Sequence, residues 1–402
     1  MYHLRGLEFV YWQLPLVAYP FLSGLVAGTF IVGSLSHVFG QKKFEPLTKM
    51  SAMMTLAFLV VAALAPLTEA TQRERFWELL TRSHIPYSPL GLFIVIWTAY
   101  LILVLVEMYF IYRADNIHLE QHAQGWRKSW HSFLTFGSRD LSPHMRERDE
   151  KVLFALSVTG ILLAFGFHGY VGFVFGALKA RPLWSNPLMM PMFIVSAIVS
   201  GVAFMIAAYV VIQRGLAAKP VDLDILDGLM KFLMGMVFID IFLDLVDLLN
   251  SGVSAYTSLA VYSGFSRIFF SGGPLAFMFW VLQIGFLVAA LVMTLFGSVR
   301  RSPLLASVTA VLVLISVFAM RYDTVIGGEL QPKVSQGLVR FVPHVFGIDS
   351  WQVLIGLVGI AVFMICLSLL LLPWEPDWIA SWAGGAAAGE EKNRALAHGQ
   401  EA

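Results

Sequence analysis

The polar residues best suited to chemistry lie between two apolar runs, in the stretch EATQRERFWELLTRSHIPYSP over Glu69–Pro89. Glu69 stands at the end of one run, and Arg73, Arg75 and Trp77 follow it at helical spacing. A carboxylate beside arginines and an indole could hold a polar headgroup and exchange protons with it. The alternative is an amphipathic turn whose charges are simply solvated.

Three aspartates lie within one apolar run at 229–250. Asp240, Asp244 and Asp247 are spaced i, i+4 and i+7, which places their carboxylates on one face of a helix. Ionisable side chains inside an apolar run are costly to bury, so each is a candidate for function. We interpret this stripe as a path for protons. The alternative is a polar seam between packed helices, with an acid at its end.

Two further residues could take part in headgroup or proton chemistry. His168 lies in the apolar segment FGFHGYVG, whose glycines would let another helix or a ligand approach closely. A histidine that only forms hydrogen bonds between helices would have the same surroundings. Tyr19 lies near the start of the first apolar run. An aromatic residue there is typical of a membrane interface, but it could also line a headgroup pocket.

The histidines and the single cysteine do not suit a metal cofactor. A b-type haem needs two histidines at matching depth, but His37 and His168 fall at opposite ends of their runs, and His84 and His344 lie between runs. Cys366 is the only cysteine, which excludes a disulfide framework, a Cys-ligated iron–sulfur cluster and a CxxCH haem site. We therefore expect no haem, iron–sulfur cluster or other metal on this chain.

The elements that would position these residues are membrane helices. The chain has 402 residues, 58% hydrophobic and 13% charged, and a soluble domain carries about twice that charged fraction. A spanning helix needs about 20 mostly apolar residues, and no open sheet edge can face lipid. Nine segments qualify, at 16–38, 50–68, 88–112, 151–178, 187–213, 229–250, 273–297, 302–320 and 350–372. We expect an all-α, polytopic membrane protein with a single integral domain, and a disordered tail from Gly384.

The distribution of positive charge indicates the orientation. Nine spans place the two termini on opposite sides, and the side that holds the C-terminus carries most of the 27 Lys and Arg residues. Seven of them lie in the connector between Arg113 and Lys151. The positive-inside rule therefore predicts a cytoplasmic C-terminus and an outer N-terminus. Trp126 and Trp130 in that connector suit a segment that lies on the inner headgroups. The near balance of acids and bases implies no nucleic-acid partner.

Three stretches on the predicted outer side together resemble one family, the NrfD/PsrC polysulfide-reductase membrane subunits, which include the HybB-type hydrogenase subunit. EATQRERFW followed by YSP is similar to the family pattern DLGRPERFW followed by TSP. FHGYVG followed by RPLW resembles a histidine with small neighbours and then HPLW. RYDTVIGGEL, which we expect in a loop over Arg321–Ser350, resembles RxxxVIGGQ. The residues that carry the resemblance are Glu69, Arg75, Phe76, Trp77, His168, Pro182, Leu183, Trp184, Arg321, Gly327 and Gly328.

The resemblance implies two four-helix bundles, over 16–178 and 187–320, followed by the last helix at 350–372. It implies a quinone, menaquinone or ubiquinone, bound near the outer ends of the first, second and fourth spans. It also implies a partner iron–sulfur subunit of ferredoxin type on the outer face, with a molybdopterin or cytochrome subunit behind it. Departures from the family pattern are Glu69 in place of aspartate, Arg181 in place of histidine and Glu329 in place of glutamine.

We therefore expect a quinone-binding subunit of a respiratory oxidoreductase complex, in the plasma membrane of a bacterium or archaeon and suited to anaerobic respiration. The expected quinone-binding residues are Tyr19, Glu69, Arg75, Trp77, His168 and Trp184. The expected proton-transfer residues are Glu69, His168, Asp240, Asp244 and Asp247. One alternative is a secondary transporter that couples to protons through these aspartates, which predicts broken helices and an inverted repeat. Another is a structural anchor that only docks its partners, which would leave the buried acids without a role.

Overall fold

The structure, a computed structural model, describes residues 9–70, 72–85, 87–253, 259–270, 272–333 and 337–374. Over these ranges the secondary structure is helical, with one isolated β-bridge between His344 and Ser350. Each of the nine apolar segments forms a helix. The all-α, polytopic fold class is thereby confirmed. The tail from Gly384 lies outside the described residues.

The long helices are α1 (Leu14–Ser34), α2 (Leu47–Glu69), α4 (Pro89–His122), α6 (Pro143–Gly176), α7 (Met189–Val211), α8 (Leu223–Asp247), the π-helical η5 (Met278–Gly285) continued by α10 (Phe286–Leu295), α12 (Pro303–Leu330) and α13 (Trp351–Leu371). The short ones are η1 (Lys42–Phe44), η2 (Arg73–Arg75), α3 (Glu78–Thr81), α5 (Trp126–Leu134), η3 (Ile212–Leu216), η4 (Leu248–Val253), α9 (Leu259–Phe269) and α11 (Gly297–Arg300). Within the described residues, eight helices are long and apolar enough to cross a membrane. The acid-bearing α8 is not among these eight, although its 25 residues reach about 37 Å at 1.5 Å per residue.

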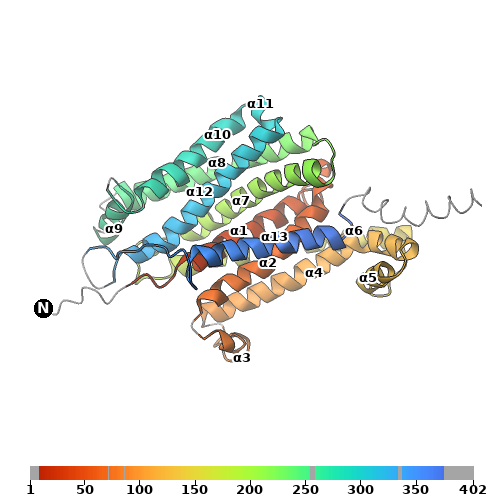
Figure 1. Cartoon of the computed structure of the whole chain (residues 1–402), viewed down its shortest axis with the longest axis horizontal. Helices are drawn as coiled ribbons and strands as arrows, with labels where there is room; N and C mark the ends of the chain where they lie inside the picture. The colour runs from red at the N-terminus through yellow and green to blue at the C-terminus, as the bar shows by residue number, and fades with distance from the viewer. Residues whose placement is uncertain are drawn as a thin grey trace, which may run out of the picture.

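The long helices pack as two groups of four that share one interface (Figure 1). In the first group α1, α2, α4 and α6 contact one another in a ring, and in the second α7, α8, α10 and α12 do the same. The groups meet where α1 packs against α7 and α12 and where α6 packs against α7. The last helix, α13, lies against α1 and α2 (Figure 1).

The interface between the groups depends on a glycine contact between α1 and α7. A Cβ atom added at Gly28 would overlap the backbone of Ala197 and Gly201, and one added at Gly201 would overlap the backbone of Gly28. Small residues are the usual way in which membrane helices bring their backbones together. The contact holds α1 and α7 side by side and so fixes how the two groups face each other.

Glu69–Pro89 and the other motif-bearing stretches lie at one end of the bundle, which we call the motif end. It holds the start of α1, the end of α2, the end of α12, and the short helices α3 and α9, on the left of Figure 1. The opposite end holds α5 and α11. The exposed aromatic side chains of Trp126 and Phe133 lie on α5.

Three helices extend well beyond their expected bounds. The loop predicted over Arg321–Ser350 is wrong in its first part, because α12 continues to Leu330 and buries Arg321 completely. The apolar run stops at residue 320, but buried partners from other helices let the helix carry charged residues further. Likewise α4 continues to His122 and α6 starts at Pro143, so most of the connector between them is helical. Buried Arg113 pairs there with Asp149.

Candidate functional site

Glu69 ends α2 and faces the start of α1. Its Oε1 accepts a hydrogen bond from the backbone N–H of Gln13, the residue that precedes the first turn of α1. A helix N-terminus has unpaired N–H groups and a partial positive charge, which stabilise a carboxylate. Oε2 of Glu69 is buried and has no hydrogen-bond partner among the described residues, and the same holds for Oε1 of Gln13. Gln13 therefore anchors the carboxylate at Oε1, the backbone N–H of Leu16 in the first turn of α1 also acts on the carboxylate, and Oε2 is left without a hydrogen bond.

Glu329, in the second group of helices, binds the segment that directly precedes α1. Its Oε2 accepts hydrogen bonds from the backbone N–H groups of Tyr11, at 2.5 Å, and Trp12, at 3.3 Å. Arg181 supports the end of α12, because its Nη1 donates to the backbone oxygens of Glu329 and Gln331 at 3.2 and 2.9 Å. Two of the three departures from the family pattern, Arg181 and Glu329, are thus neighbours in the structure.

Trp184 joins two of the motifs. Its indole is buried, its Nε1 donates to the backbone oxygen of Thr324 at 2.6 Å, and a Cβ atom at Gly328 would overlap the ring. The ring also stacks on Trp12, with centroids 5.1 Å apart. The tryptophan of RPLW and the glycine of VIGG therefore make one contact, which places Trp184 beside α12.

His168 and Arg321 form the polar centre of the interface between the two groups. Nη2 of Arg321 lies 3.1 Å from Nε2 of His168 and donates to Oγ of Ser196 at 2.6 Å. The guanidinium also lies over the ring of Phe193, 4.0 Å from its centroid. Because arginine can only donate, Nε2 accepts and the imidazole proton lies on Nδ1, which is 3.2 Å from Oγ of Ser23. His168 is thus a neutral, fully hydrogen-bonded imidazole in the protein core.

Tyr19 lies within an aromatic group at the motif end. Its ring meets Phe93 edge to face, with centroids 5.6 Å apart, and Phe93 stacks on Phe167 and Tyr170. Phe167 directly precedes His168 in α6. Phe93 therefore connects the ring of Tyr19 in α1 to the turn of α6 that carries His168.

Arg75 and Trp77 lie apart from the buried groups. Arg75 donates to both carboxylate oxygens of Glu78, at 3.0 and 2.8 Å, and these hydrogen bonds together with its charge lower the pKa of Glu78. Trp77 is 46% exposed and has the guanidinium of Arg82 over its ring. The contacts that the structure gives both residues stay within the cap between α2 and α4. They lie at the surface of the motif end.

The three aspartates of α8 point into the second group of helices. Asp240 and Asp244 are buried, and Asp244 accepts a hydrogen bond from Nε2 of Gln283 at 3.4 Å. Asp247 accepts from Asn186 at 2.5 Å and from Ser251 at 3.0 Å. The shared helix face predicted from their spacing is thus directed at protein rather than at lipid.

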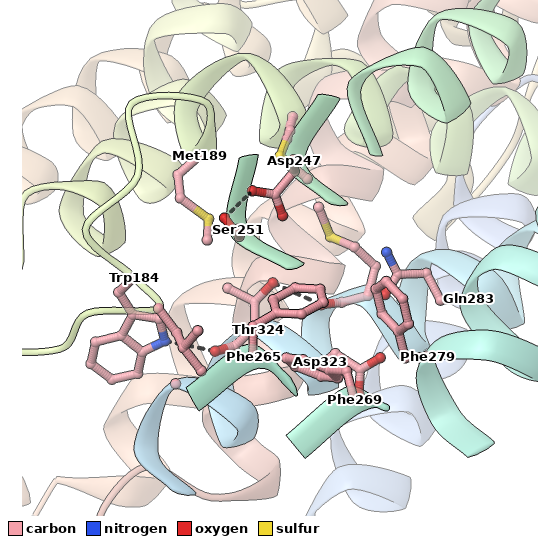
Figure 2. Close-up of a pocket in the computed structure, with 14 residues that line it drawn as sticks. Trp184, Met189, Asp247, Ser251, Phe265, Phe269, Phe279, Gln283, Asp323 and Thr324 are labelled. Atoms are coloured by element: carbon pink, nitrogen blue, oxygen red, sulfur yellow. Dashed lines mark hydrogen bonds between the residues drawn. The ribbon is translucent and has the colours of Figure 1, made fainter. Parts of the chain in front are cut away.

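A cavity lies beside these acids at the motif end of the second group. Figure 2 shows Asp247 and Ser251 on one side of it and Asp323 and Thr324 on the other. Aromatic side chains complete the wall, among them Phe265, Phe269, Phe279 and Trp184. Asp323 is 5% exposed, and neither of its carboxylate oxygens has a hydrogen-bond partner among the described residues.

Sequence reasoning missed Asp323 and the roles of Arg321 and Glu329 as buried groups. Arg321 was expected in a loop, although it lies fully buried in α12. The signal available was the continued helical spacing of apolar residues, with Val325 and Ile326 buried on the same side as the preceding turns.

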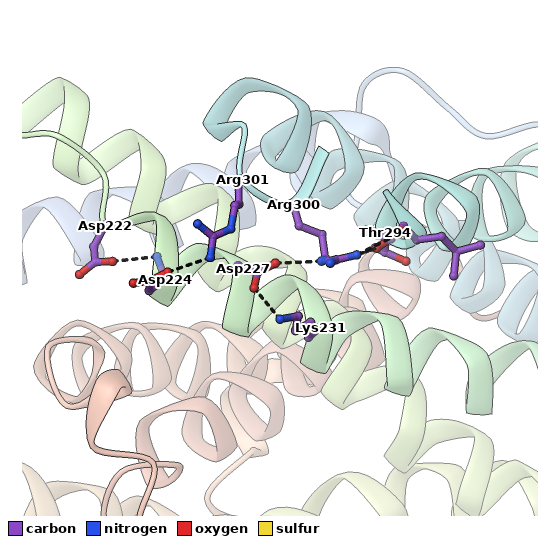
Figure 3. Close-up of polar contacts among 8 residues, drawn as sticks. Asp222, Asp224, Asp227, Lys231, Thr294, Arg300 and Arg301 are labelled. Carbon is purple, nitrogen blue, oxygen red and sulfur yellow. Dashed lines mark hydrogen bonds and ion pairs between the residues drawn. The ribbon is translucent and has the colours of Figure 1, made fainter. Parts of the chain in front are cut away.

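At the opposite end, ion pairs join the start of α8 to the region of α11. Asp227 accepts hydrogen bonds from Arg300 at 2.8 Å and pairs with Lys231 at 2.7 Å, and Arg301 pairs with Asp224 at 3.1 Å (Figure 3). These pairs tie α8 to the connection between α10 and α12. Asp224 and Asp227 are therefore paired with bases, unlike the acids that surround the cavity.

Comparison with known proteins identifies the family. A family model described as "Polysulphide reductase, NrfD" matches residues 6–333. The chain belongs to the NrfD family. This confirms the resemblance carried by Glu69–Pro89, by the RPLW stretch and by the VIGG stretch of α12. NrfD-family chains are similar to this one over most of its helices, so the shared region includes Glu69, His168 and the acids of α8.

Several relatives match this chain over half of its length or more. A selenate reductase subunit of Mesobacillus selenatarsenatis is 28% identical over 377 residues, which cover 90% of this chain and 85% of that protein. The Hdr-like menaquinol oxidoreductase integral membrane subunit of Archaeoglobus fulgidus is 21% identical, over 91% of this chain and 85% of that protein. Protein NrfD of Escherichia coli is 24% identical, over 52% of this chain and 62% of that protein.

Proposed function

We propose that this chain is the quinone-interacting membrane subunit of a respiratory oxidoreductase complex, and that the quinone headgroup binds at the motif end beside Glu69. The observation that carries the proposal is the carboxylate of Glu69, fixed at Oε1 by Gln13 and without a partner at the buried Oε2. The two hydroxyl groups of a quinol are donors, and one of them would satisfy Oε2. Ligand sites of this kind are mostly apolar with a few placed polar groups.

The chemistry of a quinol requires a proton acceptor at the site. A quinol that loses two electrons also loses two protons, and a buried carboxylate within reach of a hydroxyl can take one of them. Tyr19 lies in α1 six residues after Gln13, and its ring contacts Phe93, which stacks on Phe167, the residue before His168 in α6. Proton exchange at His168 requires Arg321 to move away from Nε2, because that nitrogen already accepts a hydrogen bond. Glu69 is therefore the first acceptor in this proposal, and His168 the second.

The names of the relatives support the electron-transfer part of the proposal. One is a subunit of a selenate reductase and another of a menaquinol oxidoreductase. We propose a ferredoxin-like iron–sulfur partner, itself attached to a molybdopterin or cytochrome subunit, that docks at the motif end. Phe76 and Trp77 are exposed on that end and could contact it. From the distribution of Lys and Arg we propose that the N-terminus and the motif end lie outside and that the C-terminus lies in the cytoplasm.

The aspartates of α8 extend the proposal to proton movement. Asp240, Asp244 and Asp247 would carry protons between the interface and the cavity of the second group. The same residues are the basis of the alternative, a proton-coupled transporter. A transporter of that type has spanning helices that unwind near the membrane centre, whereas α8 is continuous over Leu223–Asp247. This continuity favours electron transfer over transport.

Purification from native membranes tests the proposal. The chain should copurify with a ferredoxin-like subunit and should release menaquinone or ubiquinone on solvent extraction. The amount of quinone should fall in a Glu69→Leu variant and stay unchanged in a Glu74→Leu variant, since Glu74 is exposed in the same cap. A chain that purifies alone and without quinone would contradict the proposal, and uptake assays in liposomes would then test the transporter alternative.

A further inference from the structure

The cavity in the second group of helices contains a carboxylate that the protein itself leaves without a donor. Asp323 is only 5% exposed, lines the cavity, and has no hydrogen-bond partner at either oxygen among the described residues. Burying a carboxylate without a donor or a counter-charge is costly. We propose that this cavity binds an alkali-metal cation of sodium size, with Asp323 as its main ligand.

The charges around the cavity favour a cation. Asp240, Asp244 and Asp323 are buried in the second group, and Asp247 lies on the cavity wall. Arg321 acts electrostatically on Asp240 and Asp244. Its guanidinium, however, is directed at the interface, where it contacts His168, Ser196 and Phe193. One arginine cannot neutralise four acids, and intramembrane acids need cations, protons or donors.

Among the acids near the cavity, Asp244 and Asp247 have hydrogen-bond donors and Asp323 has none among the described residues, so a bound ion would stabilise Asp323 most. Asp247 already accepts from Asn186 and Ser251, and Asp244 accepts from Gln283. Arg321, the nearest residue of opposite charge on the same helix, is held elsewhere. The hydroxyl group of Ser251 and the carboxylate of Asp247 line the opposite side of the same cavity (Figure 2) and add two further oxygen-bearing groups to its wall.

The size of the cavity suits a small ion rather than a larger organic ligand. Its volume of about 50 Å³ has room for about three to five water molecules, at roughly 10–15 Å³ each. This is enough for a small ion that keeps part of its hydration shell and too little for a quinone ring. Two π-helical segments, η4 and η5, supply Ser251 and Gln283 to the wall. Such segments widen a helix and often mark functional positions.

The small number of side chains that could coordinate the ion indicates a monovalent cation. Among the described residues no three His, Cys, Asp or Glu side chains converge as a metal-binding group. Calcium usually takes six to eight oxygens, including several carboxylates, and transition metals favour nitrogen or sulfur ligands. One principal carboxylate with hydroxyl groups and water suits a weakly held monovalent ion.

Thermal unfolding of the purified chain in nanodiscs tests this inference without any quinone. The unfolding midpoint is measured in sodium, potassium and choline chloride at equal ionic strength. We expect a saturable rise of a few degrees with sodium, because an ion that binds only the native state stabilises it. Choline should give no rise. The response should disappear in Asp323→Asn and persist in Asp224→Asn, whose carboxylate lies in the exposed pair with Arg301 at the opposite end.

Each other outcome overturns the inference. An equal rise in sodium and choline would mean a general salt effect. A sodium response that survives in Asp323→Asn would place the ion elsewhere. If the unfolding midpoint of the wild type is the same in all three salts and Asp323→Asn unfolds at a higher temperature, Asp323 is protonated rather than bound to an ion. None of these results bears on the quinone site, because Glu69 lies in the other group of helices.

Discussion

Nη2 of Arg321 lies 3.1 Å from Nε2 of His168, at the centre of the interface between the two groups of helices. His168 comes from the first group and Arg321 from the second. Ser23 extends the contact into α1 and Ser196 extends it into α7. The pair therefore lies between the first group of helices, in which we place the quinone, and the acids of α8. A change at either site could reach the other through His168 and Arg321.

Replacement of Arg321 by methionine should destabilise the protein strongly. It would leave His168 and Ser196 without their donor and remove the positive charge that acts on Asp240 and Asp244. A buried polar group left without its partner costs about 1–3 kcal/mol, and both His168 and Ser196 would lose theirs. The measurement is the unfolding midpoint in nanodiscs. The double variant Arg321→Met with Asp240→Asn should recover part of the loss, and a loss that is identical in both backgrounds would refute the electrostatic explanation.

Replacement of Gly28 by alanine should separate the two groups of helices. The added methyl group would overlap the backbone of Ala197 and Gly201 in α7. In an open helix position the same change is favourable by about 1 kcal/mol, because glycine is a poor helix former. Gly166 in α6 is such a position, with no atom within 4 Å of an added Cβ. Gly166→Ala should therefore keep or raise the unfolding midpoint while Gly28→Ala lowers it, and equal effects would contradict the glycine contact.

The opposite end should respond to acid through His131 of α5. His131 is fully buried, its Nδ1 lies 2.9 Å from Oδ1 of Asn116, and burial lowers its pKa to about 4. The unfolded chain binds a proton near pH 6.5, so the folded state loses stability as the pH falls from 6.5 towards 4. The loss should be on the order of 1–3 kcal/mol.

The test of this pH dependence is a comparison with His131→Gln. The difference between the unfolding midpoints of wild type and variant should be constant above pH 7 and should shift against the wild type between pH 6.5 and 4.5. A difference that does not change with pH would mean that His131 keeps its ordinary titration in the folded protein.

The sequence predicted the nine helices because each apolar run is long enough to be recognised alone. It also predicted the shared face of Asp240, Asp244 and Asp247, which depends only on helix geometry. Such local patterns need no knowledge of distant residues.

The end of α12 could not be predicted in this way. Arg321, Asp323 and Glu329 look like the start of a loop, because charged residues normally mark the end of a span. Their burial depends on partners far away in the chain, such as His168 for Arg321 and the amides of residues 11–12 for Glu329. The roles of Glu69 and Tyr19 in binding likewise remain proposals, since spacing alone does not reveal which side chains meet a ligand.

The most direct test of the account is the quinol-linked turnover of the assembled complex with Glu69→Gln. The amide keeps the size of the side chain and its hydrogen bond from Gln13 but cannot accept a proton from a quinol. Since positioned acid–base groups contribute about 10²-fold or more, turnover should fall by about 100-fold while the partner subunits still copurify. Glu74→Gln, in the exposed part of the same cap, should match the wild type. Unchanged turnover in Glu69→Gln would remove Glu69 from the mechanism and contradict the proposed site.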